Sequence, residues 1–327
     1  MSTRDALLQL LADGAFHSGT ALGERLGVSR AAIHKGIQNL VEDGIEIHRV
    51  TGRGYRLSEA FTPLDAAAIA RALAGSGVTL PVEVLAATDS TSQHLLRRSA
   101  ADESARVCFA EAQTAGRGRR GRGWLATPYQ NIVMSMSWRF EGGPAALTGL
   151  SLAAGVAVLE ALAAFGVKGA GLKWPNDVLF DGRKLAGLLV DLRGEAAGPS
   201  LVVLGLGLNV AIAEREAAMI DQPWAALREI LPAPLDRNRL AALLVRHLGG
   251  MFRRFEREGF AAFRAEWERH HLFAGQAVCI ETALATVSGT VEGIDERGAL
   301  CVRDTHGALR SFHSGEVSLR RAARVRA

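Results

Sequence analysis

Four arginines alternate with glycines in one short stretch of the chain, GRGRRGRG at residues 116–123. Gly116, Gly118 and Gly121 satisfy the pattern G-x-G-x-x-G, which can hold a dinucleotide pyrophosphate at a helix N-terminus. Guanidinium groups are forked donors that match carboxylate and phosphate oxygens, so the arginines themselves predict an anion site. The stretch therefore allows a dinucleotide fold, an arginine-glycine arm on RNA, an anion-binding loop, or a solvated basic loop.

The sequence around the stretch favours an anion-binding loop. A strand is predicted before it, but Trp124 and a second predicted strand follow, where a dinucleotide site needs a helix. No G-K-[ST] occurs there, which excludes a Walker-type phosphate loop, and RNA-binding arms are normally longer and more repetitive. Clustered like charges destabilise a loop until an anion arrives. We therefore expect the loop to be loose when empty and ordered when filled.

Polar residues at the ends of other predicted strands are candidates for the same site. In TDSTSQ, Ser90 and Thr91 begin a predicted helix, so their hydroxyls and free N–H groups suit a carboxylate or carbonyl oxygen. In KWPND, Lys173, Asn176 and Asp177 stand at a strand end. Each motif alone is more often a helix cap or a turn. Only convergence on residues 116–123, the arginine loop, would indicate a site.

Three later features are also candidates. Lys184 follows an Asp181-Gly182 turn in a predicted hairpin. The segment GLGLN, residues 205–209, lets a ligand approach the strand backbone because glycine has no side chain. Trp224 lies in QPWAAL. Taken singly, these features would be a solvated lysine, a tight sheet crossing and a core tryptophan.

Composition limits the class of protein. The chain has 327 residues, enough for two or three domains, and 48% apolar residues, enough for a sizeable core. No apolar run reaches the roughly 18–20 residues that a membrane span requires, and we expect residues 145–166, which include Glu160, to form a buried helix. Cys108, Cys279 and Cys301 show neither metal-ligand nor disulfide spacing. We expect buried reduced thiols, no signal peptide and a cytoplasmic location.

Residues 1–62 predict a winged helix-turn-helix domain. A first short helix ends at Gly14, and two further helices joined by a turn at Gly27 precede a hairpin that turns at residues 52–54. Ser29 is expected to cap the helix over residues 29–43. The apolar stripe of this helix predicts burial of Ile33, Ile37, Leu40 and Val41. A helix of this kind can enter the major groove of DNA. The residues expected to face DNA are Ser29, Arg30, His34, Lys35 and Gln38 on this helix, with Arg53 at the wing tip.

The charge of this domain leaves an alternative open. The first 60 residues carry seven basic and seven acidic side chains, whereas a DNA footprint is usually basic. A dimerisation or docking module of the same shape therefore remains possible.

The remaining chain predicts an α+β protein. Residues 63–270 read as a central domain, with a helix capped by Thr62, Pro63 at its first position, and further helices over 90–100, 146–166 and 237–268. The strands form hairpins, which favours a mixed sheet with helices on one face. Residues 271–327 lack helical periodicity and read as a small β-barrel, in which nothing looks catalytic.

The motifs together resemble biotin protein ligase. The segments DSTSQ, EAQTAGRGRRGRGW, KWPNDV, GRKLAGLLV and GLGLN occur in this order, and GRGRRGR-x-W followed by KWPND is specific. The winged helix and the final barrel resemble the bifunctional bacterial form, the biotin operon repressor, over essentially the whole chain. The resemblance implies a central sheet like that of class II synthetases and an SH3-like C-terminal barrel.

The resemblance also implies roles for individual residues. Lys184, Arg119 and Arg117 would be catalytic, and Mg²⁺ would lie near Asn176 and Asp177. The residues implied to contact biotin are Ser90, Thr91, Ser92, Gln113, Arg117, Gly118, Arg119 and Lys184. Those implied to contact ATP or the adenylate are Arg120, Arg122, Trp124, Lys173, Asn176, Asp177, Asn209 and Trp224. Ser92 stands where the family often has Asn, and Leu125 stands where an aromatic residue is common, so the chain departs from the family pattern at these two positions.

The implied reaction is activation of biotin by ATP to biotinyl-5′-AMP, followed by transfer to a lysine of a biotin carboxyl carrier protein. Mg²⁺ would accompany ATP. The resemblance further implies binding to operator DNA and a homodimer when the adenylate is bound, with no membrane partner. Lipoate attachment, a repressor without catalysis, and a ligase that binds no operator are the alternatives.

Overall fold

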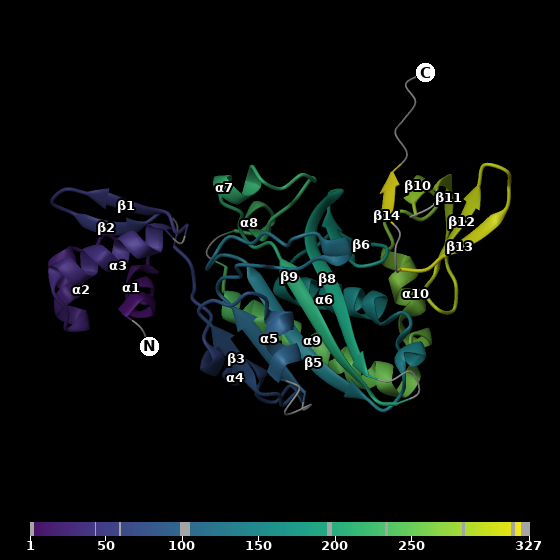
Figure 1. Cartoon of the computed structure of the whole chain (residues 1–327), viewed down its shortest axis with the longest axis horizontal. Coiled ribbons are helices and arrows are strands. Elements are labelled where there is room, and N and C mark those ends of the chain that lie inside the picture. Colours follow the sequence, from purple (N-terminus) through teal and green to yellow (C-terminus); the bar gives the residue numbers. More distant parts are fainter. Residues whose placement is uncertain are drawn as a thin grey trace, which may run out of the picture.

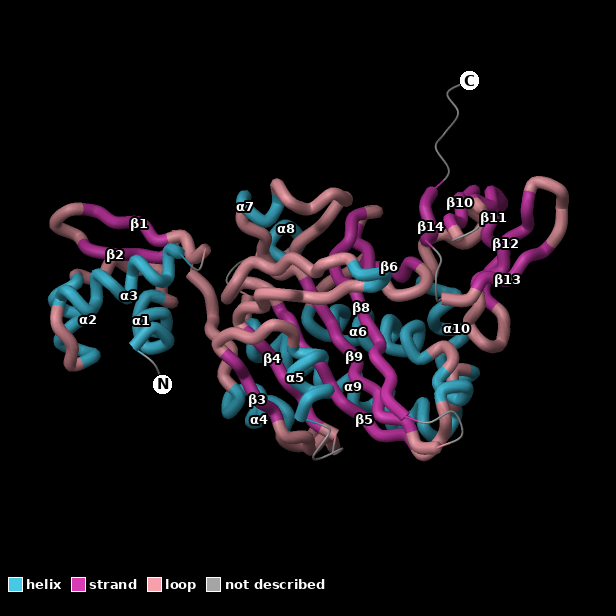
Figure 2. The backbone as a smooth tube through the Cα atoms, viewed as in Figure 1, coloured by secondary structure: helices cyan, strands magenta, loops and turns pink. Residues whose placement is uncertain are grey.

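The computed structural model describes residues 3–42, 44–58, 60–98, 105–194, 198–232, 235–282, 285–314 and 318–321. An N-terminal helical unit, a central sheet backed by helices, and a C-terminal sheet follow one another along the longest axis (Figure 1). The backbone tube shows that helices dominate the first unit and strands the last (Figure 2).

The N-terminal unit has the predicted order of three helices and a hairpin. Its elements are α1 (Thr3–Leu11), α2 (Gly19–Leu26), α3 (Arg30–Glu42), β1 (Ile47–Val50) and β2 (Gly54–Leu57). The Ser29 hydroxyl accepts a hydrogen bond from Ala32 N at 3.2 Å, as its predicted capping position requires. Ile33, Ile37 and Leu40 are buried as expected, but the prediction for Val41 is wrong, since half of that side chain is exposed.

The central sheet is mixed, as predicted, and its seven strands have the order β3-β4-β5-β9-β8-β7-β6. Strands β3 and β4 are parallel, and every other neighbouring pair is antiparallel. The turn between β7 and β8 is the predicted one at Asp181 and Gly182, both with positive φ. The strands are β3 (Val82–Leu85), β4 (Arg106–Ala110), β5 (Ile132–Phe140), β6 (Ala170–Lys173), β7 (Asp177–Phe180), β8 (Arg183–Gly194) and β9 (Ser200–Leu208).

Helices cover both faces of this sheet, so the prediction of helices on one face is wrong. Helices α6 (Leu150–Phe165) and α9 (Arg237–Glu258) pack on one face, whereas α5 (Thr91–Arg98) packs on the other (Figure 1). The reason is that β4 and β9 are apolar on both faces: Cys108 and Val203 meet Leu95 of α5 in a separate small cluster. The expectation that no apolar run is long enough to span a membrane is wrong for residues 144–165, which end in α6 and are long and apolar enough to do so. Of an apolar 18-residue stretch within them, 67% is buried inside the protein, as expected for a buried helix.

Two helix boundaries differ from the predictions. Helix α4 (Ala66–Leu73) is capped by Asp65, whose carboxylate accepts from Ala68 N at 2.8 Å, so Thr62 and Pro63 lie outside it. The predicted helix over 237–268 is broken, because Gly259 has φ 64° and separates α9 from α10 (Ala261–His270). The short helices are α7 (Glu214–Ala217) and α8 (Leu227–Ile230), with 3₁₀ turns η1 (Arg119–Gly121) and η2 (Pro144–Leu147).

The C-terminal unit is an antiparallel sheet with the order β13-β12-β11-β10-β14. Its strands are β10 (Ala277–Glu281), β11 (Thr286–Ile294), β12 (Leu300–Asp304), β13 (Leu309–Phe312) and β14 (Ser318–Arg321). Its buried residues, such as Ile280 and Val302, belong to the same hydrophobic cluster as the central domain. The sheet is therefore packed against the central domain and does not form a separate core.

Candidate active site

The arginine loop and several strand ends enclose a pocket of about 840 Å³. Fourteen residues with predicted ligand contacts line it: Ser90, Ser92, Gln113, Arg117, Gly118, Arg119, Arg122, Trp124, Lys173, Asn176, Asp177, Lys184, Asn209 and Trp224. Among the predicted contacts, Thr91 and Arg120 are absent from this lining. Thr91 is buried beside it, and Arg120 is exposed on the loop.

A buried hydroxyl network holds the start of α5 at one end of the pocket. Gln113 Oε1 accepts from Thr91 N at 2.8 Å, and Ser135 Oγ lies 2.8 Å from Thr91 Oγ1 and 2.9 Å from Ser92 Oγ. Ser135, on β5, was not predicted as a site residue. Its signal was present in the sequence, because Ser135 and Ser137 are polar residues that alternate with apolar ones along this strand.

Glycines form the part of the pocket wall against which Trp124 packs. A Cβ atom at Gly207 would stand 2.2 Å from Trp124 Cε2, and one at Gly187 would stand 3.0 Å from Trp124 Cζ3. A Cβ at Gly205 would stand 2.7 Å from Ser92 Oγ. The indole Nε1 of Trp124 is buried with no hydrogen-bond partner among the described residues. The glycines of GLGLN thus allow close approach to the strand, as predicted, and here Trp124 uses that space.

The loop itself is a short hairpin. Gly118 N donates to Arg122 O at 2.7 Å, and Trp124 N donates to Gly116 O at 2.9 Å. Arg120 has φ 58°, a left-handed conformation that an arginine rarely adopts. A strand follows the loop, so the exclusion of a dinucleotide fold is confirmed.

Two loop arginines are tied to the pocket wall. Arg117 donates both terminal nitrogens to Asp191 of β8, at 3.3 and 3.4 Å. Arg119 donates to Asn176 Oδ1 at 3.2 Å and also contacts the carbonyl oxygen of Ser314 in the C-terminal unit. Burial lowers the pKa of the Arg119 guanidinium. Asp191 was missed by the sequence reasoning, since nothing local marks it as a partner of the loop.

A single carboxylate joins two lysines on the opposite wall. Lys184 Nζ lies 2.8 Å from Asp177 Oδ1, and Lys173 Nζ lies 3.9 Å from Asp177 Oδ2. Lys184 Nζ also lies 5.5 Å from the centre of the Trp124 ring. Arginine and lysine side chains outnumber carboxylates around the pocket: Arg117, Arg119, Arg122, Lys173 and Lys184 against Asp177 and Asp221. This excess of positive charge favours an anionic ligand.

The segment that contains Trp224 extends the sheet beside Lys184. Lys184 N donates to Pro223 O, and Ala225 N donates to Lys184 O, both at 2.9 Å. The Asn209 amide donates to the carbonyl oxygens of Lys184 and Ala225, each at 3.2 Å. Asn209 therefore holds this wall together through its backbone partners as well as lining the pocket.

The C-terminal unit closes one side of the pocket. Phe273 and Leu319 line it, and Lys173 Nζ lies 6.0 Å from the centre of the Phe273 ring. We predicted nothing catalytic in residues 271–327. Their contributions here are the apolar side chains of Phe273 and Leu319 and the carbonyl oxygen of Ser314, which contacts Arg119. They nevertheless place the unit at the site, which no local pattern of the sequence indicated.

The predicted DNA-facing residues belong to the N-terminal unit, which lies to one side of the central sheet (Figure 1). Ser29, Arg30, Lys35 and Gln38 are exposed. His34 is half-buried, and its Nδ1 lies 3.2 Å from the Tyr55 hydroxyl.

Arg53 is exposed at the wing tip, with its guanidinium 4.3 Å from the centre of the Phe16 ring.

Cys108 is buried, as predicted for all three thiols, but Cys279 and Cys301 are only half-buried. No disulfide joins the three cysteines.

Three family models match the chain in the order of its structural units. Residues 3–56 match an HTH domain, residues 84–209 match the biotin/lipoate A/B protein ligase family, and residues 273–320 match the biotin protein ligase C terminal domain. The second match covers the strands and the loop that enclose the pocket.

Full-length relatives agree with these matches. The chain is 42% identical to the bifunctional ligase/repressor BirA of Escherichia coli, over 97% of each chain. It is 40% identical to the biotin--[acetyl-CoA-carboxylase] ligase of Mycobacterium tuberculosis, over 78% of this chain and 95% of the relative. The biotin protein ligase of Aquifex aeolicus in complex with biotin and ATP superposes with a TM-score of 0.62 at 27% identity, covering 74% of this chain and 99% of that chain. The pocket, the three family matches and these identities together show that the chain belongs to the biotin protein ligase family, in its bifunctional ligase/repressor form.

Proposed function

We propose that this protein activates biotin with ATP and transfers the biotinyl group to a lysine of a biotin carboxyl carrier protein. The observation that carries the proposal is the convergence of Arg119, Lys184 and Trp124 on one pocket with an excess of positive charge. The names of its relatives, a ligase of acetyl-CoA carboxylase among them, agree with this reaction.

The biotin-binding residues of the proposal lie at the α5 end of the pocket and along the loop. The network of Thr91, Ser92 and Ser135 would present hydroxyls to the polar ureido ring, since these groups both donate and accept. Trp124 would cover the ligand, and Lys184 would reach its carboxylate. The full set is Ser90, Thr91, Ser92, Gln113, Arg117, Gly118, Arg119 and Lys184.

The nucleotide would occupy the rest of the pocket. Asp177 and Asn176 offer the oxygen ligands that Mg²⁺ prefers, and one carboxylate together with phosphate oxygens suffices for this ion. When bound, Mg²⁺ would neutralise phosphate charge. Trp224 would stack on the adenine, while the phosphates would meet Arg120, Arg122 and Lys173, with Asn209 near the adenosine.

The chemistry needs positive charge more than a protein nucleophile. A biotin carboxylate oxygen attacks the α-phosphorus, the bond to the β-phosphate bridging oxygen breaks, and pyrophosphate leaves. Two anions must approach, so Arg117, Arg119 and Lys184 would offset their repulsion and stabilise charge in the transition state. The mixed anhydride is sensitive to water, which the closed loop would exclude. The acceptor amine then attacks the biotinyl carbonyl, and AMP leaves.

The decisive test is mass spectrometry of a carrier domain incubated with this protein, biotin and MgATP. One biotinyl addition is expected, and reactions that lack ATP should give none. A protein that binds biotin without modifying the carrier would instead be a repressor that has lost catalysis. Pyrophosphate exchange measured once with biotin and once with lipoate distinguishes a biotin ligase from a lipoate ligase, because only the true substrate should drive exchange.

The N-terminal unit supports a second activity, repression through operator DNA. Arg30, Lys35 and Gln38 are exposed on α3, the helix that would enter the major groove, and Arg53 lies at the wing tip. We propose that the adenylate favours a homodimer, which would place two such helices on a palindromic operator. Analytical ultracentrifugation should show a doubled mass with biotin and MgATP. An unchanged mass, or equal binding to operator and random DNA by fluorescence anisotropy, would refute the coupling.

The division into domains follows the same proposal. Residues 1–62 would bind DNA, residues 63–270 would bind biotin and ATP, and residues 271–327 would complete the site. A class II synthetase-like central sheet and an SH3-like C-terminal barrel fit the observed strand orders. A cytoplasmic location would place the enzyme with its carrier protein.

A further inference from the structure

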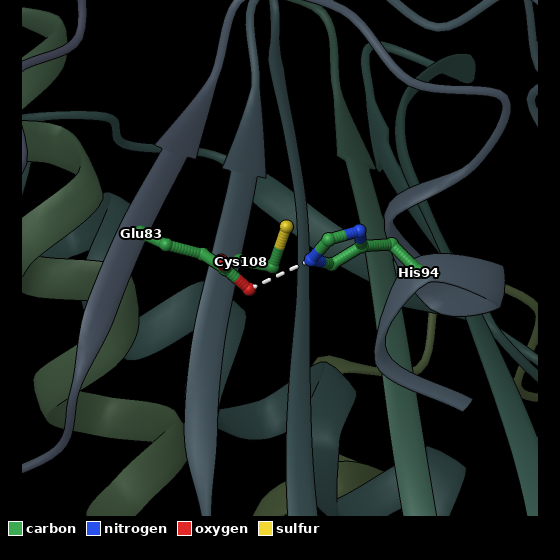
Figure 3. A group of neighbouring side chains, drawn as sticks. All are labelled: Glu83, His94 and Cys108. Carbon is green, nitrogen blue, oxygen red and sulfur yellow. Dashed lines mark hydrogen bonds and ion pairs between the residues drawn. The ribbon is translucent and has the colours of Figure 1, made fainter. Parts of the chain in front are cut away.

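Glu83, His94 and Cys108 form a compact cluster of metal-ligating side chains outside the ligase pocket (Figure 3). One ligand atom from each residue lies within 4.8 Å of the other two. His94 Nε2 is 3.0 Å from Glu83 Oε1. The residues come from three elements, β3, α5 and β4, so tertiary packing alone brings them together.

The fold aims all three side chains at one point. Glu83 and Cys108 are direct partners in the parallel pairing of β3 with β4, so their side chains leave the same face of the sheet. Helix α5 lies across this face and directs His94 back onto them (Figure 3). Cys108 is fully buried beneath, while Glu83 and His94 are about one-quarter exposed. A cation could therefore enter from solvent and rest on a buried sulfur.

The surroundings are those of a supported metal site. Leu95 and Val203 pack with Cys108 in an apolar cluster, which forms a dry wall behind the sulfur. Arg98 donates to Glu83 Oε2 at 3.0 Å and so fixes the carboxylate while leaving Oε1 directed at His94. Burial, with the Glu83 carboxylate nearby, raises the pKa of the Cys108 thiol, so a thiol proton must pass to solvent when a cation binds.

We propose that Glu83, His94 and Cys108 bind one Zn²⁺ ion. Zinc accepts a thiolate, an imidazole and a carboxylate at about 2.0–2.3 Å, so its ligand atoms stand about 3.5 Å apart, a spacing that small side-chain rotations here would supply. A sulfur ligand makes Mg²⁺ and Ca²⁺ poor occupants. The fourth position would face solvent and hold water.

Such a site would fasten α5 to the edge of the central sheet. His94 N donates to Ser90 O at 2.8 Å, so the site lies one helical turn from the start of α5. An ion that binds only the folded state stabilises it by an amount that rises with the logarithm of the ion concentration once that concentration exceeds the dissociation constant. Added Zn²⁺ should therefore raise the melting temperature of the wild-type protein, whether or not the chain acts as a ligase.

Direct titration of the full-length, untagged protein with Zn²⁺, in competition with a chromophoric chelator, tests the proposal. We expect one tight equivalent. Cys108→Ser and His94→Asn should each weaken it by at least about 100-fold, since loss of even an outer-shell partner costs about 10–100-fold. Cys301→Ser is the matched control, because that thiol is half-buried in another sheet, and it should bind like wild type.

Cobalt supplies an independent readout. Co²⁺ bound to wild type should show a thiolate-to-metal charge-transfer band that Cys108→Ser lacks and Cys301→Ser keeps. His94→Asn changes a partly exposed residue, so it guards against a folding defect in the buried Cys108 variant. Absence of tight Zn²⁺ binding, equal binding by wild type and His94→Asn, or a cobalt complex without the thiolate band would each overturn the proposal.

Discussion

The indole of Trp124 lies against the backbone of Gly207, so closely that a Cβ atom there would stand 2.2 Å from Trp124 Cε2. Trp124 ends the arginine loop, and Gly207 belongs to β9. The position of the loop over the pocket is therefore set by a missing side chain on the sheet as much as by its own arginines.

Gly207→Ala should displace Trp124 and weaken closure of the loop. We expect biotinylation to fall about 100-fold, since displacement of a positioned group by about 1 Å can cost that much. The steady-state rate of biotinyl transfer to the carrier domain is the measurement. Gly250→Ala is the control, because a Cβ at residue 250 meets nothing within 4 Å, and it should leave the rate unchanged. A fully active Gly207→Ala enzyme would show that Trp124 need not pack there.

Lys184→Ala and Arg119→Ala should each depress adenylate formation by about 10²–10³-fold, as removal of a donor to developing charge does elsewhere. Biotin-dependent pyrophosphate exchange is the measurement. Lys168→Ala, at an exposed position outside the pocket lining, should exchange normally. Exchange near the wild-type rate in both site variants would refute their assigned roles.

Arg237→Ala should be strongly destabilising. Arg237 is buried and donates to Glu111 Oε2 at 2.6 Å, and Glu111 also accepts from Leu64 N at 2.6 Å. Removal of one partner from a buried ion pair costs about 3–5 kcal/mol, because the other charge stays buried. Urea unfolding should show this loss of unfolding free energy. Arg246→Ala, exposed on the same helix, should change it little.

His271 should make stability depend on pH. Burial lowers its pKa to about 4, from an ordinary value of 6.5, and Nε2 has no hydrogen-bond partner among the described residues. Between these two values the unfolded chain binds a proton that the folded chain excludes. The contribution of His271 to the free energy of unfolding is therefore fully present above about pH 6.5. It declines by up to about 3 kcal/mol as pH falls toward 4.

Urea unfolding of wild type and His271→Phe at pH 7.5 and 4.5 checks this expectation. The variant keeps an aromatic ring between Trp267 and Phe273 but cannot titrate. Its stability should fall less between the two pH values than that of wild type. The exposed His306→Gln should retain the wild-type pH dependence. An identical decline in His271→Phe would place the pH dependence elsewhere.

Trypsin should distinguish an open loop from a closed one. We expect cleavage at the arginines of residues 117–122 without ligands and protection when biotin and MgATP are both present, because anions offset the clustered charge. Mass spectrometry of the fragments identifies the sites. Cleavage at exposed Arg49 on the N-terminal hairpin serves as the internal control. Equal cleavage at the loop in both states would remove support for ligand-driven closure.

Local patterns predicted local structure well. The Ser29 cap, the Asp181-Gly182 turn and the hairpin of β1 and β2 all occur where the residue types place them. Errors arose where distant residues compete for the same groups. Arg237 and Asn238 donate to the carbonyl oxygens of Thr62 and Pro63, which thus serve tertiary contacts instead of a helix start.

The sequence by itself determined the chemical groups of the site and their order along the chain, since both are covalent facts that short motifs express. It also determined most turns and caps, which depend on hydrogen bonds between near neighbours. Only the tertiary structure decided that Ser135 and Asp191 support the pocket and that Phe273 closes one side of it. It also decided that α5 lies on the face of the sheet opposite α6 and α9. These relations depend on the packing of apolar surfaces far apart in sequence, and local periodicity does not encode which surfaces will meet.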